Sequence, residues 1–371
     1  MKKGLIIILI LAFLTTMAFV GCKTTAAEAA AAEAVAEEAA EEAVAEEAVE
    51  EAAAEEAVEE AAAETVTLGI AATSKDVKDM TVGFIPMGMA NEFVVTLVEG
   101  GKKAAKELGL TLNVQSTTSF AQPEDQLQFV ETMLSSNIDG IVLMAVDPKS
   151  MLSVTKRCQD GNIPLIAVDQ LFDAKMLEEA NLKVVPGIAT ENVTGGRVLG
   201  EWVKANFPKG TKIFLLRGVA TSPTNIQRYD GFFEALGKDY LDVVAEQNCD
   251  WSIDLAYTAT QNVLMSNPDI QLVFGFCDGM GIGALRAIEE ANLADKIKIV
   301  GYNGDPEALD LVAEGKFAAT IAQHPEVMGY LGVHYVVDLL QGKSVPVYTD
   351  SGIALVTNAA EVTAFREALK Q

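Results

Sequence analysis

A glycine-rich stretch in the second half of the chain offers the first candidate chemistry. The residues VFGFCDGMGIGALRAI (Val273–Ile288) place glycines between an apolar segment and a helical pattern. A turn of this kind binds dinucleotide phosphates when it reads Gly-x-Gly-x-x-Gly and an acid follows about 20 residues later. After Gly281 and Gly283, however, Arg286 occupies the place of the third glycine. The next apolar segment ends in Asn303 instead of an acid, so the stretch is a weak match to a nucleotide site.

Side chains that follow apolar runs form a second candidate group. They are Asn91, Asp169, Cys277, Asn303 and Gln323. If the runs are parallel strands, their carboxyl ends meet along one edge of a sheet, which is where open α/β sheets bind ligands. We therefore expect these side chains to lie at a binding site.

The remaining reactive residues form no catalytic or metal-binding pattern. His324 and His334 are ten residues apart, with no acidic or cysteine ligand at metal spacing. Cys158, Cys249 and Cys277 include no Cys-x-x-Cys pair, and their odd number leaves at least one free thiol. We expect all three to be small buried hydrophobes. Since no nucleophile–base pair or cofactor loop is present, the sequence predicts no enzyme, no metal and no cofactor.

The elements that position these residues alternate between strand and helix patterns from Met80 to Gln371. The predicted strands are TVGFIP, TLNVQS, DGIVLMAV, IPLIAVD, TKIFLL, IQLVFGF, KIKIVGYN and AATIA. The predicted helices include Phe93–Leu108, Asn192–Asn206, Ile282–Glu290 and Val327–Leu340. This alternation predicts an α/β fold with parallel sheets flanked by helices. A body of about 290 residues is long enough for two lobes.

The N-terminus has the pattern of a bacterial export signal. In MKKGLIIILILAFLTTMAFVGC, two lysines precede an apolar run and a small residue precedes Cys22. The end of this segment is similar to a lipobox, in which the cysteine receives lipid after residues 1–21 are removed, although Phe19 replaces the usual leucine. The alternative is an uncleaved membrane anchor. Both interpretations predict an exported, periplasmic or cell-surface protein attached to a membrane.

A spacer of residues 22–77 is predicted to follow. Ala26–Glu64 contains 15 glutamates, no Lys or Arg and no aromatic residue, and these glutamates account for more than half of the net charge of −26. Alanine and glutamate favour helix, but like charges repel and little apolar surface is available for burial. We expect a part-helical, part-disordered spacer; a coiled coil is the alternative, disfavoured because no large a/d residues recur. The net negative charge gives no indication of the basic surface that nucleic-acid binding requires.

Several segments, taken in order, resemble the periplasmic sugar-binding proteins of the ribose/galactose type. They are VGFIPMGMANEFVVTLVEGGKKAAKELG, DGIVLMAVDP, IPLIAVDQ, NIQRYDGFFEAL, IQLVFGFCDGMGIGALRAI and IVGYNGDPEALDLVAEGKFAATIAQHPEVMG. The resemblance implies the type I periplasmic-binding-protein fold, in which two Rossmann-like lobes are joined by three hinge crossings. It implies a first lobe of residues 78–190 and 324–350 and a second lobe of residues 191–323 and 351–371. The glycine-rich stretch then corresponds to a turn into a helix beside the sugar cleft, with no phosphate.

The resemblance also implies roles for individual residues in that cleft. It matches Asn91 and Phe93 to a hydroxyl-reading amide and a ring that packs on the sugar. It matches Asp169 and Arg228 to a carboxylate and a guanidinium that face each other from the two lobes. Two further residues match an aromatic wall and a hinge amide: Trp251 and Gln323. Each has a structural alternative, such as Asn91 capping the helix that starts near Phe93.

Four positions depart from the pattern of ribose binders. Gln170 stands in place of an arginine, Cys277 in place of an asparagine, Asn303 in place of an aspartate and Val94 in place of a second aromatic. The cleft thereby loses two opposite charges, an amide and a ring. These departures argue against ribose, and the expected ligand is a neutral sugar or polyol.

The predicted function is that of a monomeric, lipid-anchored solute-binding protein. The resemblance implies delivery of the ligand to an ABC permease and, indirectly, to its ATPase. An alternative with the same residues is a receptor that presents its ligand to a membrane chemoreceptor or sensor kinase. A repressor of the related lactose-repressor type is disfavoured, because a signal and an acidic spacer stand where its helix-turn-helix would be.

Overall fold

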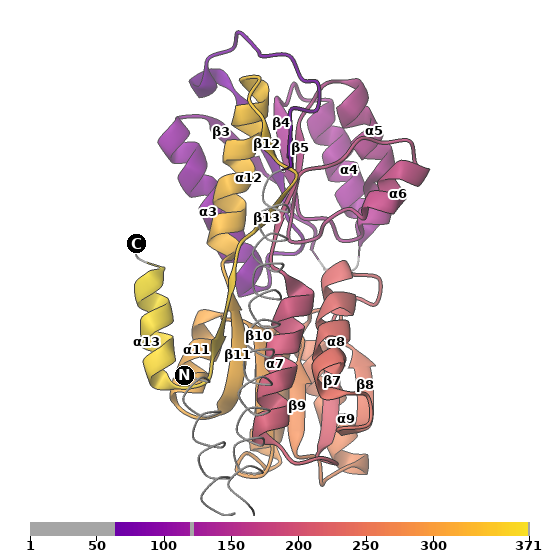
Figure 1. Ribbon diagram of the computed structural model, residues 1–371, viewed down its shortest axis with the longest axis vertical. Coiled ribbons are helices and arrows are strands. Elements are labelled where there is room, and N and C mark those ends of the chain that lie inside the picture. The colour runs from indigo at the N-terminus through magenta and orange to yellow at the C-terminus, as the bar shows by residue number, and fades with distance from the viewer. Residues whose placement is uncertain (1–63, 119–121, 370–371) are drawn as a thin grey trace, which may run out of the picture. The chain divides into compact units, whose positions relative to one another are not determined.

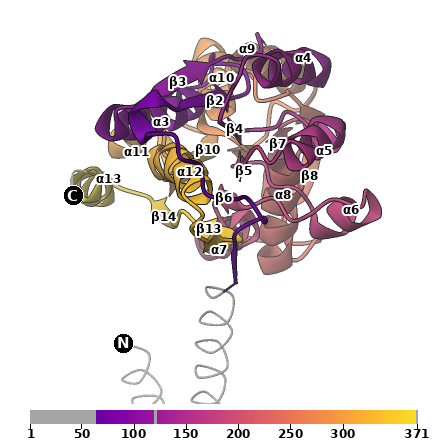
Figure 2. The ribbon, with the colours of Figure 1, turned by 90° about the horizontal axis from the view of Figure 1, so that it is seen from above.

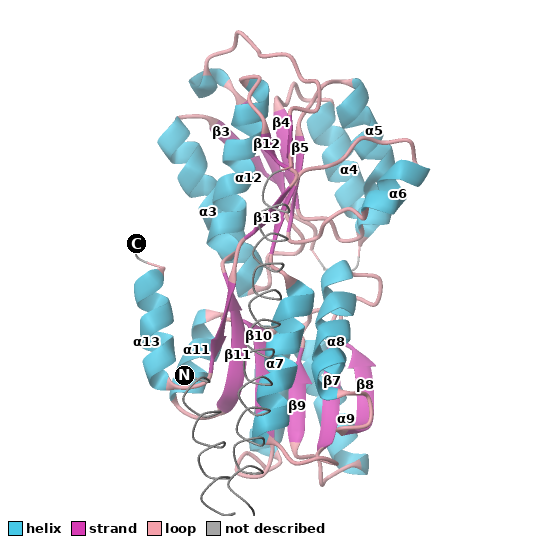
Figure 3. Cartoon of the chain, in the orientation of Figure 1, coloured by secondary structure: helices cyan, strands magenta, loops and turns pink. Residues whose placement is uncertain are grey.

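The computed structural model describes residues 64–118 and 122–369. The predicted signal peptide, Cys22 and the spacer up to residue 63 lie outside the described residues. Residues 64–369 contain two six-stranded sheets and one two-stranded sheet (Figures 1 and 3). None of the helices among the described residues is long and apolar enough to cross a membrane.

The first lobe is built on a parallel sheet. Its strands, in spatial order, are β13 (Tyr348–Asp350), β6 (Gly187–Ala189), β5 (Leu165–Val168), β4 (Gly140–Leu143), β2 (Thr81–Ile85) and β3 (Thr111–Val114). All residues of β4 and β5 are buried, which explains why these strands are unbroken apolar runs instead of alternating ones.

Helices cover both faces of this sheet. Helices α3 (Glu92–Leu108) and α12 (Pro325–Leu340) pack together on one face, and α4 (Pro123–Leu134) and α5 (Leu152–Asp160) lie on the other (Figures 1 and 2). The remaining helical segments of this lobe are η1 (Val77–Asp79), η2 (Pro148–Met151) and α6 (Ala174–Glu179).

The second lobe repeats this architecture. Its sheet contains β14 (Ile353–Val356), β11 (Phe317–Gln323), β10 (Lys298–Asn303), β9 (Leu272–Gly275), β7 (Lys212–Arg217) and β8 (Asp242–Asn248). All pairs are parallel except β11 with β14. Its helices are α7 (Asn192–Asn206), α8 (Pro223–Leu236), α9 (Ile253–Ser266), α10 (Asp278–Glu290), α11 (Pro306–Ala313) and α13 (Ala359–Ala368).

The chain passes between the two sheets three times: from β6 to α7, from β11 to α12 and from β13 to β14. The first and third crossings run side by side, since the Ser351 amide donates to the Ala189 carbonyl at 2.9 Å and the Thr190 and Ser351 hydroxyls lie 3.1 Å apart. The predicted fold class of two Rossmann-like lobes joined by three crossings is confirmed.

The glycine-rich stretch serves close packing. Its helix α10 packs against α9, and a Cβ atom added at Gly283 would collide with the Ile253 carbonyl oxygen at the start of α9. At Gly275, an added Cβ would lie 2.6 Å from the Gly281 amide nitrogen, where the chain turns from β9 into α10. These glycines are explained by the approach of two backbones, without any phosphate.

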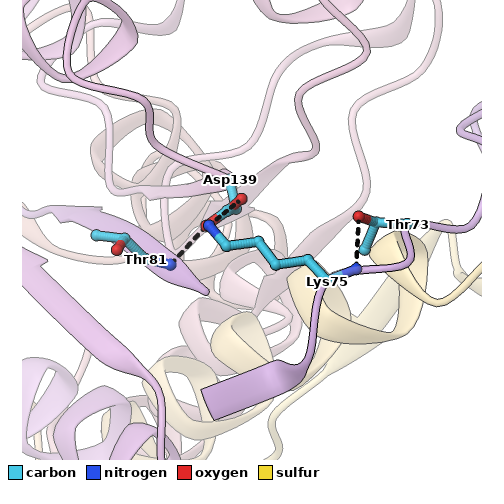
Figure 4. A network of polar contacts seen from close by, with 4 residues as sticks. All are labelled: Thr73, Lys75, Thr81 and Asp139. Atoms are coloured by element: carbon cyan, nitrogen blue, oxygen red, sulfur yellow. Dashed lines mark hydrogen bonds and ion pairs between the residues drawn. The ribbon is translucent and has the colours of Figure 1, made fainter. Parts of the chain in front are cut away.

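Residues 64–77, which the sequence interpretation assigned to the spacer, lie against the first lobe. Here β1 (Thr65–Val66) pairs antiparallel with β12 (Val345–Pro346). Lys75 Nζ contacts Asp139 Oδ2 at 2.7 Å, and the same oxygen accepts a hydrogen bond from the Thr81 amide at 2.6 Å (Figure 4). The apolar side chains of this segment pack on the core: Val66, Leu68, Ile70 and Val77. The spacer boundary at residue 77 is therefore corrected, because this segment supplies apolar surface that the preceding alanines and glutamates lack.

Candidate functional site: a cavity between the two lobes

Side chains from both lobes enclose a small cavity. Its lining comprises Met87, Asn91, Phe93, Val94, Met144, Asp169, Gln170, Thr224, Arg228, Trp251, Cys277 and Asn303. The empty space among these atoms, including the part that opens to solvent, is about 310 Å³. Eight of the nine residues proposed from the sequence as ligand-binding line this cavity, and Gln323 does not.

Asp169 supplies an acceptor from the first lobe. It directly follows β5 with a left-handed φ of 61°, and its amide donates to the Ile188 carbonyl at 2.9 Å. Its Oδ2 accepts a hydrogen bond from Gln170 Nε2 at 2.8 Å, whereas its buried Oδ1 has no partner among the described residues. Burial raises the pKa of Asp169, and the nearby Arg228 charge and the Gln170 hydrogen bond oppose that rise. A buried acceptor without a partner is costly unless a ligand satisfies it.

Arg228, on α8 of the second lobe, supplies positive charge. Its Nε donates to Asn192 Oδ1 at 2.9 Å, and its Nη1 donates to the Phe276 carbonyl at 2.5 Å. The guanidinium lies 3.8 Å from the centroid of the Tyr302 ring and 5.6 Å from that of the Trp251 ring. The Arg228 charge also lies close enough to Asp169 to oppose the rise of its pKa.

Two aromatic rings come to the cavity from opposite lobes. Asn91 caps α3 by accepting from the Phe93 amide at 2.9 Å, and both side chains line the cavity. The capping interpretation of Asn91 is thus confirmed. Trp251 has a left-handed φ of 62° and lies against Gly218, where a Cβ atom would collide with the indole.

Gln170 bridges the lobes. Its Nε2 donates to Thr224 Oγ1 at 2.9 Å, and its Oε1 accepts from Ser222 Oγ at 3.0 Å. The two hydroxyls are 3.0 Å apart, so the three side chains form a closed ring of hydrogen bonds. Sequence reasoning missed Ser222 and Thr224, because no apolar run ends beside them.

Asn303 connects the cavity to buried carboxylates. Its Oδ1 accepts from Gln323 Nε2 at 3.0 Å, and its Nδ2 donates to Asp305 Oδ2 at 3.3 Å. Gln323 therefore contacts a lining residue instead of lining the cavity. Asp278 Oδ2 accepts the amide of Asp305 at 2.9 Å, and its Oδ1 accepts the Thr320 hydroxyl at 2.7 Å. Burial raises the pKa of Asp278 to about 6, and burial together with the Asp278 charge raises that of Asp305.

The cysteines are buried free thiols in the described part of the chain. Burial raises the pKa of Cys158, Cys249 and Cys277 to about 12, so all three remain protonated near neutral pH. Only Cys277 lines the cavity. No cluster of three or more His, Cys, Asp or Glu side chains suited to a metal ion occurs among residues 64–118 and 122–369.

Comparison with known proteins gives consistent matches over this part of the chain. Residues 82–344 match the model of the periplasmic binding protein domain. The ribose import binding protein of Haemophilus influenzae is 32% identical over 283 residues, which are 76% of this chain and 92% of that protein. Among solved structures, an ABC transporter periplasmic solute-binding protein from Actinobacillus succinogenes with bound D-allose superposes with a TM-score of 0.71. It shows 25% identity and covers 77% of this chain and 100% of its own.

A second solved structure, an ABC transporter solute-binding protein from Mycobacterium smegmatis with bound glycerol, has a TM-score of 0.70 and 26% identity. The match covers 77% of this chain and 96% of that one.

Proposed function

The chain belongs to the type I periplasmic sugar-binding proteins, and we propose that it captures a neutral sugar or polyol between its lobes for an ABC importer. The relatives named above are import or solute-binding proteins of transporters and are not enzymes. The D-allose and the glycerol bound in the two solved structures support this class of ligand for the present chain.

The observation that carries the proposal is the unpartnered Oδ1 of Asp169 inside a cavity that also holds Arg228 and two aromatic rings. A sugar hydroxyl can donate to that oxygen while the guanidinium donates to a neighbouring hydroxyl. The apolar face of a sugar suits the Phe93 and Trp251 rings. One carboxylate and one guanidinium nearly cancel, so a charged ligand would add an uncompensated buried charge.

Capture is proposed to follow from contacts with both lobes. A ligand shifts an open–closed equilibrium only if it binds one state better than the other. A sugar that meets Asp169 in the first lobe and Arg228 in the second gains both contacts only when the lobes are closed. Gln170 adds a contact between lobes that needs no ligand.

Export and lipid attachment at Cys22 belong to the same proposal, as do the monomeric state and delivery to a permease with its ATPase. They rest on the N-terminal sequence pattern and on the transporter names of the relatives. We propose the lobe bounds that the sequence predicted, with the start of the first lobe moved from residue 78 to about residue 64.

A thermal-shift panel on the full chain tests the ligand class. Pentoses, hexoses, polyols and cyclitols are compared with nucleotides and amino acids. We expect at least one neutral member to raise the melting temperature in a concentration-dependent way. Stabilisation by a nucleotide or amino acid alone, with every sugar and polyol silent, would contradict the proposal.

A further inference from the structure

The polar atoms that line the cavity divide into free and engaged groups. Among the described residues, Asp169 Oδ1 is the buried acceptor of this lining that has no partner. Arg228 uses its Nε and Nη1 on Asn192 and the Phe276 carbonyl, and Asn91 uses its Oδ1 to cap α3, so we assign the other N–H groups of these two side chains to the ligand. These atoms can meet two or three hydroxyls of a ligand. They are the hydrogen-bonding groups of the cavity that we expect a ligand to contact.

The engaged groups include Gln170 and Thr224. Ser222 gives its single hydroxyl proton to Gln170 Oε1, so the 3.0 Å contact between the hydroxyls uses the proton of Thr224. Both N–H groups of the Gln170 amide are also used, on Asp169 and Thr224. Asn303 has its oxygen engaged by Gln323 and its nitrogen engaged with Asp305. Gln170 and Thr224 therefore have no N–H or O–H group left for a ligand, and Asn303 uses one of its two amide N–H groups inside the protein.

The rest of the lining is poor in hydrogen-bonding groups. Met87, Val94 and Met144 from the first lobe and Cys277 from the second are all at most 3% exposed. Cys277 occupies the N-cap position of α10 without making a side-chain cap. A protonated thiol is a weak donor and a weak acceptor. A ligand hydroxyl placed against it would lose its hydrogen bonds to water with little replacement.

We infer that Cys277 is a specificity-determining residue, and that the ligand presents a hydroxyl-free methyl or methylene edge to it. The ligand class is then the deoxy sugars and deoxy polyols. This inference rests on the proposed function, since it names which neutral sugars the same cavity prefers.

Matched pairs of sugars that differ by one hydroxyl test the inference. Calorimetric titrations of the full chain compare D-galactose with D-fucose, L-mannose with L-rhamnose, and D-ribose with its 2-deoxy and 5-deoxy forms. We expect at least one deoxy member to bind about tenfold more tightly than its parent. If each parent binds more tightly than its deoxy partner, the inference is overturned while sugar capture stands. If no neutral sugar or polyol binds at all, the proposed function fails with it.

Substitutions at Cys277 test whether this residue causes the preference for a deoxy ligand. Cys277→Asn and the smaller change Cys277→Ser each add hydrogen-bonding groups, and we expect both to shift the preference toward the hydroxylated parent by about tenfold. Cys277→Ala should keep the preference of the wild type. Cys158→Ala, in the first lobe and outside the cavity, is the matched control. An unchanged preference in both Cys277→Asn and Cys277→Ser would overturn the role of this residue.

Discussion

The Nε2 atom of Gln170 in the first lobe donates a hydrogen bond to Thr224 Oγ1 in the second lobe at 2.9 Å. This contact joins the loop that follows β5 to the first turn of α8, on opposite sides of the cavity. A hydrogen bond of this kind can form only when the lobes are closed. It therefore biases the open–closed equilibrium on which ligand capture depends.

Gln170→Ala removes the contact between the lobes. Because two buried hydrogen bonds to the second lobe are lost, we expect ligand affinity to fall by about tenfold. Small-angle scattering of the unliganded protein should show a larger radius of gyration. The exposed Gln128, on α4, provides the control Gln128→Ala. Unchanged affinity and unchanged dimensions would remove Gln170 from the closing contact.

Asp169→Ala removes the free buried acceptor. Hydrogen bonds to ionised groups contribute more than neutral ones, so affinity should fall by about ten- to a few-hundred-fold. The thermal midpoint without ligand should change little or rise, since the unpartnered oxygen is lost as well. Asp230→Ala, on the exposed face of α8, is the matched control. Wild-type affinity in Asp169→Ala would exclude this carboxylate from the site.

The sequence predicted the buried strands β4, β5 and β9 and the residues at their ends, but it missed β6, whose three buried residues are too short a run to be recognised. Asp169 and Asn303 could be found because each ends an apolar run whose carboxyl end faces the cleft. Strand β8 was missed because it lies at the edge of its sheet, where its residues are half-buried or exposed and form no apolar run.

Tertiary contacts account for the other differences. Ser222 and Thr224 lie at the start of α8, and their bonds to Gln170 depend on the opposite lobe. The resemblance predicted that Gln323 lines the cavity. In the structure its amide nitrogen donates to Asn303, which is the residue that lines the cavity. The packing of residues 64–77 depends on β12, which lies about 280 residues later in the chain. No local pattern contains that information.

The buried carboxylates predict a pH dependence of stability. The pKa of Asp278 rises from 3.8 to about 6, so between these values the folded state holds a proton that the unfolded chain releases. The free energy of unfolding should therefore fall as pH increases from about 4 to about 6. Asp305, whose pKa is raised as well, adds to this fall, and the Arg228 charge opposes it.

Asp305→Asn should make this decrease shallower, because one of the two buried carboxyl groups no longer titrates. Thermal midpoints of the unliganded protein at several pH values measure the slope. The exposed Asp295→Asn serves as control. A slope equal to that of the wild type in Asp305→Asn would contradict this origin of the pH dependence.

Cys22→Ser tests the proposed anchor. The thiol is the acylation point, so both lipid attachment and signal cleavage should be abolished. Mass spectrometry of the protein expressed with its own N-terminus detects both. Cys158→Ser should be processed as the wild type is. Normal lipidation of Cys22→Ser would refute the lipobox interpretation.

Intrinsic fluorescence tests most directly whether a sugar binds in the cavity between the lobes. Trp251 lines this cavity, whereas Trp202 lies on α7 with its ring 6.1 Å from that of Phe207, and these are the two tryptophans of the chain. Titration with a stabilising neutral sugar should change the emission of the wild type and of Trp202→Phe, and leave Trp251→Phe almost unchanged. A sugar that binds by calorimetry without altering the emission of Trp202→Phe would contradict binding at this site.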